Sequence, residues 1–147
     1  MTAPPRTAAF LLLLLTAAAP AGDWLTADRE GVIRIAPCPT PRAATLCGTI
    51  IGVLAPALDV QGRSQCGLEI IHTLAPDAAG TWHGRITDPE TGRAYNARIT
   101  PQPDGTIRLR GALDVPLLRD LFGSTQTWTR HAGPIGPACL LPKQPPG

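Results

Sequence analysis

Side chains that support catalysis or metal binding are few and scattered in this 147-residue chain. Its two serines, Ser64 and Ser124, lie outside any Gly-x-Ser-x-Gly sequence, which is the signature of a hydrolase nucleophile. The three histidines, His72, His83 and His131, fall on separate segments without the close spacing of a metal-binding motif. No acid/base carboxylate pair, phosphate loop or dinucleotide-binding fingerprint is recognisable. We therefore expect no catalytic residue, no metal and no cofactor; a three-histidine site built from separate strands is the alternative.

The four cysteines, Cys38, Cys47, Cys66 and Cys139, form an even set that is typical of disulfides in a small exported domain. Three pairings are open. We favour Cys38–Cys47, because the turn-rich segment 39–44 between them brings two strands together, and Cys66–Cys139, which would tie the C-terminal tail to the body. The chain has no Cys-x-x-Cys sequence, which argues against a zinc site and a redox motif.

Residues 1–21 have the features of a secretory signal peptide. Arg6 precedes an apolar run over 8–15, and Ala19-Pro20-Ala21 matches an A-x-A cleavage site. The apolar run is shorter than the roughly 20 residues of a membrane-spanning helix. We expect cleavage after Ala21, an exported protein that is periplasmic or secreted, and no membrane span in the mature form.

The composition limits the class of protein. The chain is 44% hydrophobic and 16% charged, which is too apolar for a disordered protein. A formal net charge of +2 and 4% aromatic residues argue against a nucleic-acid partner. The length allows one domain, which we place over residues 22–131, followed by a Pro/Gly-rich tail over 132–147.

Short apolar segments separated by Gly and Pro turns predict an all-β fold. Turn signals about 8–12 residues apart are typical of an antiparallel sandwich or barrel. The segment 114–122 is the exception, because Asp114 and Pro116 suit the start of a short helix that would close one end of the fold. The eight predicted strands are Asp23–Ala27, Val32–Ala36, Leu46–Leu54, Gly67–Leu74, Thr81–Thr87, Ala94–Thr100, Thr106–Ala112 and Thr125–His131.

Alternation within the strands indicates one buried and one wet face. Ile107 and Leu109 share a face, and Arg108 and Arg110 share the other. We interpret the arginines as the solvated side of a sheet rather than as a binding patch.

An ordered set of short phrases resembles a bacterial exported family, domain of unknown function 2147. The resemblance implies a small lipocalin-like β-barrel of the cell envelope with no assigned activity. The chain departs from the family pattern at Asp59-Val60-Gln61-Gly62 and at Ser124, so the sequence leaves open whether it keeps any family site in the Asp59 loop. The matching phrases are Gly22-Asp23-Trp24, Ile35-Ala36-Pro37-Cys38, Leu46-Cys47-Gly48-Thr49-Ile50, Trp82-His83-Gly84-Arg85-Ile86, Asp88 to Tyr95, and Leu121 to Arg130.

The resemblance also suggests structural roles. Trp24 on the first strand and Arg130 on the last look like the closure signature of calycin barrels, in which a guanidinium stacks on an indole. Asp88 and Gly92 have a sufficient explanation as parts of a hairpin turn. We therefore interpret these four residues as structural.

Gln126 and Trp128 share one face of the last strand with Arg130, and buried polar groups on that face need partners. Asp88, Tyr95 and Trp82 are the candidate partners. Should the barrel be hollow, Trp82, Tyr95, Gln126 and Trp128 are the candidate ligand-binding residues. We expect non-catalytic binding of a small apolar or amphipathic ligand. The main alternative is an envelope interaction module whose barrel is filled by its own side chains, and an enzyme of unknown type is the weakest.

Overall fold

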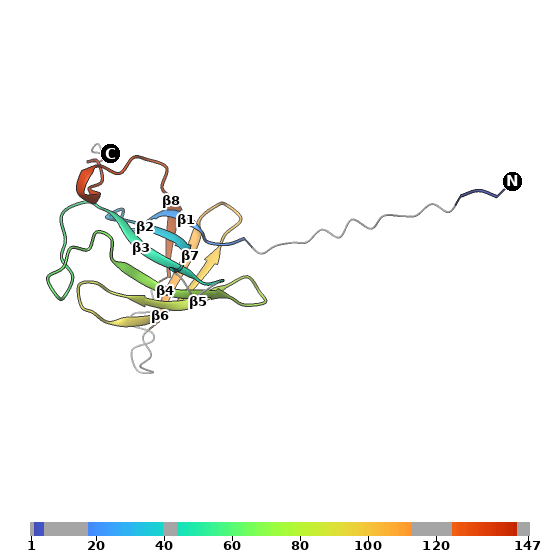
Figure 1. Ribbon diagram of the computed structural model, residues 1–147, viewed down its shortest axis with the longest axis horizontal. Coiled ribbons are helices and arrows are strands. Elements are labelled where there is room, and N and C mark those ends of the chain that lie inside the picture. Colours follow the sequence, from blue (N-terminus) through green and yellow to red (C-terminus); the bar gives the residue numbers. More distant parts are fainter. Residues whose placement is uncertain (1, 5–17, 40–43, 113–124, 144–147) are drawn as a thin grey trace.

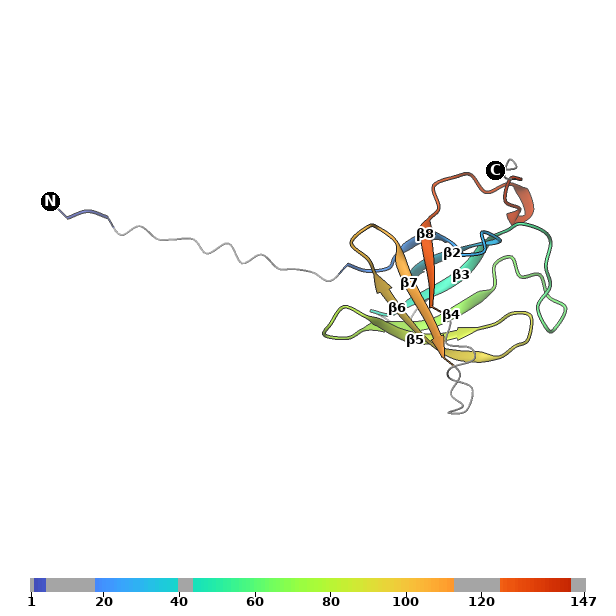
Figure 2. The ribbon, with the colours of Figure 1, turned by 180° about the vertical axis from the view of Figure 1, so that it is seen from behind.

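Each predicted strand forms, and all eight pair in sequence order to close a single antiparallel barrel (Figures 1 and 2). The computed structural model describes residues 2–4, 18–39, 44–112 and 125–143. The last strand pairs back onto the first, so no strand of the sheet is left as an edge. The strands are β1 (Gly22–Leu25), β2 (Gly31–Pro37), β3 (Leu46–Val53), β4 (Glu69–Pro76), β5 (Trp82–Thr87), β6 (Ala94–Pro101), β7 (Ile107–Ala112) and β8 (Thr125–Arg130).

The two-residue side-chain period decides what fills the barrel. On β6 and β7, Ala97 and Ile99 lie opposite Gly111 and Leu109, and these inward positions alternate with exposed arginines. Three strand pairs, β2–β3, β3–β4 and β4–β5, contain register shifts that bend the sheet. The buried core cluster includes Trp24, Ile33, Ile35, Ile50, Ile71, Leu74, Trp82, Ile99, Ile107, Leu109 and Trp128.

The barrel has two different ends. The mouth is defined by the loops 26–30, 54–68 and 88–93, and the base by the loops 77–81 and 102–106 together with the chain that enters β1. The predicted helix over 114–122 lies outside the described residues. The described residues contain no helix that is long and apolar enough to cross a membrane.

Both favoured disulfides form, Cys38–Cys47 and Cys66–Cys139. The second holds a tail that runs from β8 at the base along the outside of the barrel to the mouth end of β3, through the 3-10 turn η2 (Pro137–Cys139). There the N–H of Leu141 donates to the carbonyl of Val53 at 2.9 Å. A Cβ at Gly52 would lie 2.7 Å from Cδ2 of Leu141, so the glycine gives the tail room to lie this close.

Candidate functional site

The mouth of the barrel opens into a cavity of about 520 Å³ between β4 and β8. A second cavity of about 400 Å³ adjoins it beneath the β3–β4 loop, and both share Asp28, Ile70, Pro89 and Glu90. Each volume exceeds the roughly 300 Å³ at which small-molecule sites begin. The inner wall of the larger cavity is formed by Ile70, Ile86, Tyr95, Leu109, Gly111 and Trp128.

Three of the four predicted ligand-binding residues lie together on this cavity. Tyr95, Gln126 and Trp128 line it, from β6 and β8. Trp82 does not line it, because β5 begins at the base and places the indole opposite Ile99 in the core. Its Nε1 is buried and has no hydrogen-bond partner among the described residues. Strand alternation gave the correct face for Trp82 but not its depth in the barrel.

The β7–β8 ladder positions the polar side of the cavity. Trp128 lies opposite Ile107 and is 3% exposed, while Gln126 lies opposite Leu109, one inward step nearer the mouth. The Trp128 Nε1 donates to Oε1 of Gln126 at 3.1 Å. The described partner of Gln126 is therefore its own strand neighbour, and the expectation that Asp88, Tyr95 or Trp82 would fill this role is wrong.

Asp88 and Gly92 form the hairpin turn at the rim of the cavity. The Asp88 carboxylate accepts from the N–H of Glu90 at 2.9 Å and from the hydroxyl of Thr91 at 3.0 Å. Gly92 has a φ of 74°, a left-handed conformation that glycine adopts without strain. The turn holds the Asp88 carboxylate at the cavity rim, where Pro89 and Glu90 also lie.

The β3–β4 loop is organised by Asp59, whose carboxylate is 2% exposed. It accepts from the backbone N–H groups of Gln61 and Arg63, at 2.9 and 2.8 Å, and from the Arg63 guanidinium. Burial acts to raise the pKa of Asp59, but the donors from Arg63 and Gln61 outweigh it and lower that pKa. The N–H of Val60 then donates to the carbonyl of Pro89, which ties this loop to the rim hairpin.

In the sequence, Asp59 stands out only as part of a departure from the family pattern, which does not predict this role. The sequence signal for this role is an aspartate at the start of a turn, because an aspartate side chain commonly accepts a hydrogen bond from the backbone N–H two residues later. Its carboxylate is engaged entirely within the loop and does not line either mouth cavity.

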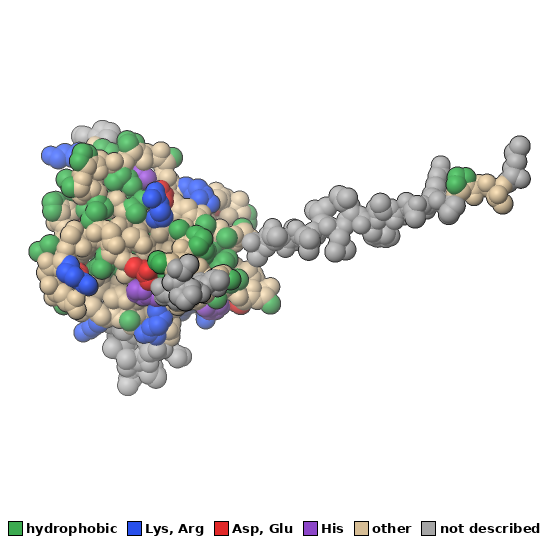
Figure 3. Space-filling view, viewed as in Figure 1, with side chains coloured by type: hydrophobic (Ala, Val, Ile, Leu, Met, Phe, Trp, Pro, Cys, Tyr) green, Lys and Arg blue, Asp and Glu red, His purple; other side chains and the backbone are tan. Residues whose placement is uncertain are grey.

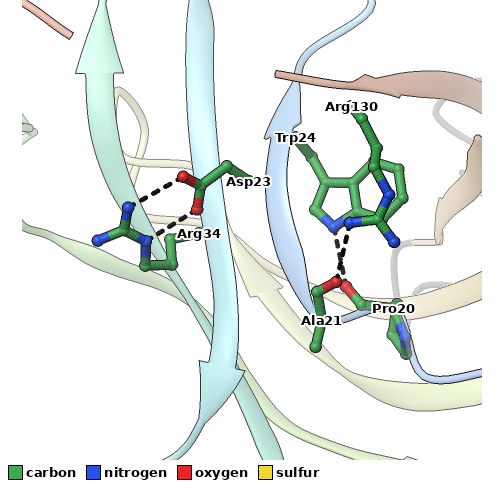
Figure 4. Close-up of polar contacts among 6 residues, drawn as sticks. All are labelled: Pro20, Ala21, Asp23, Trp24, Arg34 and Arg130. Carbon is green, nitrogen blue, oxygen red and sulfur yellow. Dashed lines mark hydrogen bonds and ion pairs between the residues drawn. The ribbon is translucent and has the colours of Figure 1, made fainter. Parts of the chain in front are cut away.

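At the base, Trp24 and Arg130 lie opposite each other on β1 and β8 (Figure 4). The Arg130 guanidinium carbon is 4.4 Å from the centroid of the Trp24 ring, and Nη1 donates to the carbonyl of Ala21 at 3.2 Å. The Trp24 Nε1 donates to the carbonyl of Pro20 at 2.8 Å. Gly22 has a φ of 134°, and a side chain there would collide with the guanidinium. Arg130 thus has its partners at the base, and none of Asp88, Tyr95 and Trp82 is among them.

The three histidines lie in separate environments. His72 contacts Glu69 and Thr87, at 2.8 and 3.1 Å, and the Nε2 of His131 is buried without a partner among the described residues. His83 contacts Asp77 at 2.7 Å, and this hydrogen bond lowers the pKa of Asp77. Among the described residues, no group of three His, Cys, Asp or Glu side chains is placed to hold a metal.

The closed, eight-stranded, antiparallel barrel is a lipocalin-like fold. The chain belongs to the bacterial family described as "Uncharacterized protein conserved in bacteria (DUF2147)", whose model matches residues 22–130, and this confirms the family resemblance. Its fold is similar to that of protein HP1028 from Helicobacter pylori, described as belonging to the lipocalin family. The TM-score is 0.63, with 15% identity over 78% of this chain and 84% of that chain. No curated protein matches the chain.

Proposed function

We propose that this chain is an exported envelope protein that binds a small apolar or amphipathic molecule in the barrel mouth without transforming it. The cavity of about 520 Å³ is the observation that carries the proposal. It falls within the roughly 300–1,000 Å³ range of small-molecule sites, which are mainly apolar with a few placed polar groups. The aromatic rings of Tyr95 and Trp128 and the amide of Gln126 supply that combination here.

The distribution of side chains along the barrel supports a site at the mouth rather than through the whole interior. Towards the base, Trp24, Trp82, Ile35 and Ile99 are all buried in the core cluster. Towards the mouth, Gly111 contributes no side chain, and a Cβ built there would meet only ordinary contacts with Tyr95 and Ile86. A ligand would therefore enter only the upper part of the barrel.

The exported location rests on the N-terminal segment and on the cysteines. Two disulfides fit an oxidising compartment such as the periplasm or the exterior. The basic start, apolar run and A-x-A sequence of residues 1–21 supply the route.

A second candidate function, an interaction module, is favoured by one observation. The three large hydrophobic side chains that are exposed in the described structure, Leu54, Leu58 and Val60, all lie on the β3–β4 loop. They are 44%, 63% and 58% exposed. Figure 3 shows apolar side chains on this flank of the barrel. A protein partner would bury them without using the cavity.

Gly111→Leu is the variant that separates the two functions. The leucine side chain would occupy the cavity while leaving the loop unchanged, and Thr127→Leu places the same side chain on the exposed outer face of β8 as a control. Native mass spectrometry of protein purified from its own cell envelope is the measurement. We expect a co-purified small molecule with the wild type and Thr127→Leu and none with Gly111→Leu. The mass of the co-purified small molecule should stay unchanged on incubation with the protein, because the protein binds the molecule without transforming it.

A protein partner that co-purifies equally with all three forms, without any small molecule, would support the interaction module and contradict the binding proposal. A product that accumulates during incubation would contradict the absence of catalysis.

A further inference from the structure

The described walls of the mouth cavities are acidic, although the whole chain has more basic than acidic residues. Their walls contain Asp28, Glu30, Asp88 and Glu90. Among the residues that the structure describes, neither wall contains a lysine or an arginine. The cavity, with its apolar interior, is the site, and these carboxylates set the charge at its entrance.

Two loops carry these carboxylates, and both face the same opening. Asp28 accepts from the hydroxyl of Thr26 at 2.6 Å and from the N–H of Glu30 at 3.0 Å. Asp88 accepts from Glu90 N–H and from the Thr91 hydroxyl in the rim hairpin. All of these donors are neutral, so these hydrogen bonds fix the carboxylates without neutralising their charge.

The arginines nearest these loops in sequence do not enter the cavities. Arg29 lines a separate hollow with Leu25 and Thr129 beneath the C-terminal tail. Arg93 is exposed at the end of the rim hairpin and is not part of either wall. The exposed arginines of β6 and β7, Arg98, Arg108 and Arg110, alternate with inward residues and therefore lie on the outside of the barrel.

Beneath the rim, the cavity is suited to an apolar body. Ile70, Ile86 and Leu109 form aliphatic wall, and Tyr95 and Trp128 add aromatic rings. Aromatic faces attract cations as well as apolar groups. The carboxylates at the rim, in contrast, repel an anion that enters the cavity past them. We infer that the ligand is a cationic amphipath, with an aliphatic or aromatic body in the cavity and a protonated amine or quaternary ammonium at the rim.

This inference rests on the proposed binding function and specifies its ligand class. A neutral amphipath would fill the same apolar volume but gain nothing from the rim. An anionic one would meet four carboxylates at the entrance. We expect a cation to bind about tenfold more tightly than a neutral molecule of the same body at low ionic strength, and an anion to bind most weakly.

The test uses three probes with the same ten-carbon chain, namely decylammonium, decanol and decanoate, titrated into the protein by calorimetry below their aggregation concentrations. We expect the affinity order decylammonium, decanol, decanoate, with the cation's advantage shrinking as salt is added. Glu30→Gln/Glu90→Gln should reduce that advantage several-fold and leave decanol affinity unchanged. Asp104→Asn, which removes one carboxylate from the base, is the control for carboxylate loss away from the mouth and should change neither.

The outcomes separate the inference from the proposed function. Equal or tighter binding of decanol or decanoate that is lost in Gly111→Leu would overturn the inference and leave cavity binding in place. A cation preference of unchanged size in Glu30→Gln/Glu90→Gln, or decylammonium binding that persists in Gly111→Leu, would also overturn it. Failure of all three probes to bind would instead contradict the proposed function itself.

Discussion

The Arg130 guanidinium lies over the Trp24 indole, 4.4 Å from guanidinium carbon to ring centroid, where the last strand of the barrel meets the first. The two residues are direct neighbours in the β1–β8 ladder, and β1 is only four residues long. Few backbone pairs therefore join β1 to β8 at this seam, and the stack of Arg130 on Trp24 adds a side-chain contact to them.

Arg130→Met should weaken the seam. We expect the loss of about 1 kcal/mol in the free energy of unfolding, because the change removes a cation–π contact and the hydrogen bond to Ala21. Arg130→Lys keeps the charge but not the planar guanidinium and should recover only part of that loss. Urea denaturation measures both; a lysine variant as stable as the wild type would show that charge alone matters.

The residues just before β1 are part of the base. Pro20 is fully buried, and its carbonyl accepts from the buried Trp24 indole N–H. A chain that begins at Gly22, as cleavage after Ala21 would produce, lacks both Pro20 and Ala21 and places a positive amino group beside Arg130. We expect it to be about 1–3 kcal/mol less stable than a chain that begins at Ala18, since a buried donor is left unpaired. Equal unfolding midpoints for the two chains would contradict this.

The two disulfides should contribute unequally. Cys66–Cys139 spans 73 residues and Cys38–Cys47 spans 9. Chain-entropy arguments give about 4 kcal/mol for the longer loop and about 2.5 kcal/mol for the shorter. We therefore expect the double serine variant at 66 and 139 to lose more stability than the one at 38 and 47. Hydrogen exchange should show the loss centred on Val53 and the tail in the first variant alone.

Asp23 and Arg34 form a two-point ion pair between β1 and β2, at 2.8 and 2.9 Å (Figure 4). The hydrogen bond from Arg34 lowers the pKa of Asp23. A lowered pKa in the folded state stabilises the protein above the unfolded value of about 3.9, and this stabilisation is lost as pH falls through the folded pKa.

The Asp23–Arg34 pair is partly exposed, with side-chain exposures of 28% and 55%, so we expect Asp23→Asn to cost only about 0.5–1 kcal/mol at pH 7. At pH 2 the difference between the variant and the wild type should be smaller than at pH 7. Arg34→Gln should match Asp23→Asn at pH 7, and the double variant should add little to either. A difference between Asp23→Asn and wild type that is the same at both pH values would contradict the ion-pair explanation.

Asp59 should control the order of the β3–β4 loop. Asp59→Ala leaves the N–H groups of Gln61 and Arg63 without their acceptor. We expect faster hydrogen exchange at residues 59–65 and at the rim hairpin that Val60 contacts, with little change at the base. Arg63→Gln, which keeps the backbone contacts of Asp59, is the control and should give a smaller effect confined to the loop.

Most of the fold could be predicted from the sequence because local rules and tertiary structure agree. Alternation and turn residues located all eight strands to within two residues at each end. The turn-rich segment between Cys38 and Cys47 predicted the first disulfide, and the C-terminal tail that contains Cys139 predicted the second. Trp82 was misplaced because a two-residue period gives the face of a strand but not its position between mouth and base. The role of Pro20 depends on a backbone carbonyl, and the acidic rim is assembled from loops distant in sequence, so neither leaves a local pattern.

The course of the tail sets the geometry of any attachment to the molecule. The chain enters β1 at the base, whereas residues 140–143 lie beside the mouth end of β3. A protein immobilised through its N-terminus would present its cavity to solution. The same protein held through a C-terminal tag would have its support next to the opening. Binding measured on the two surfaces should therefore differ in rate, even though the barrel is the same.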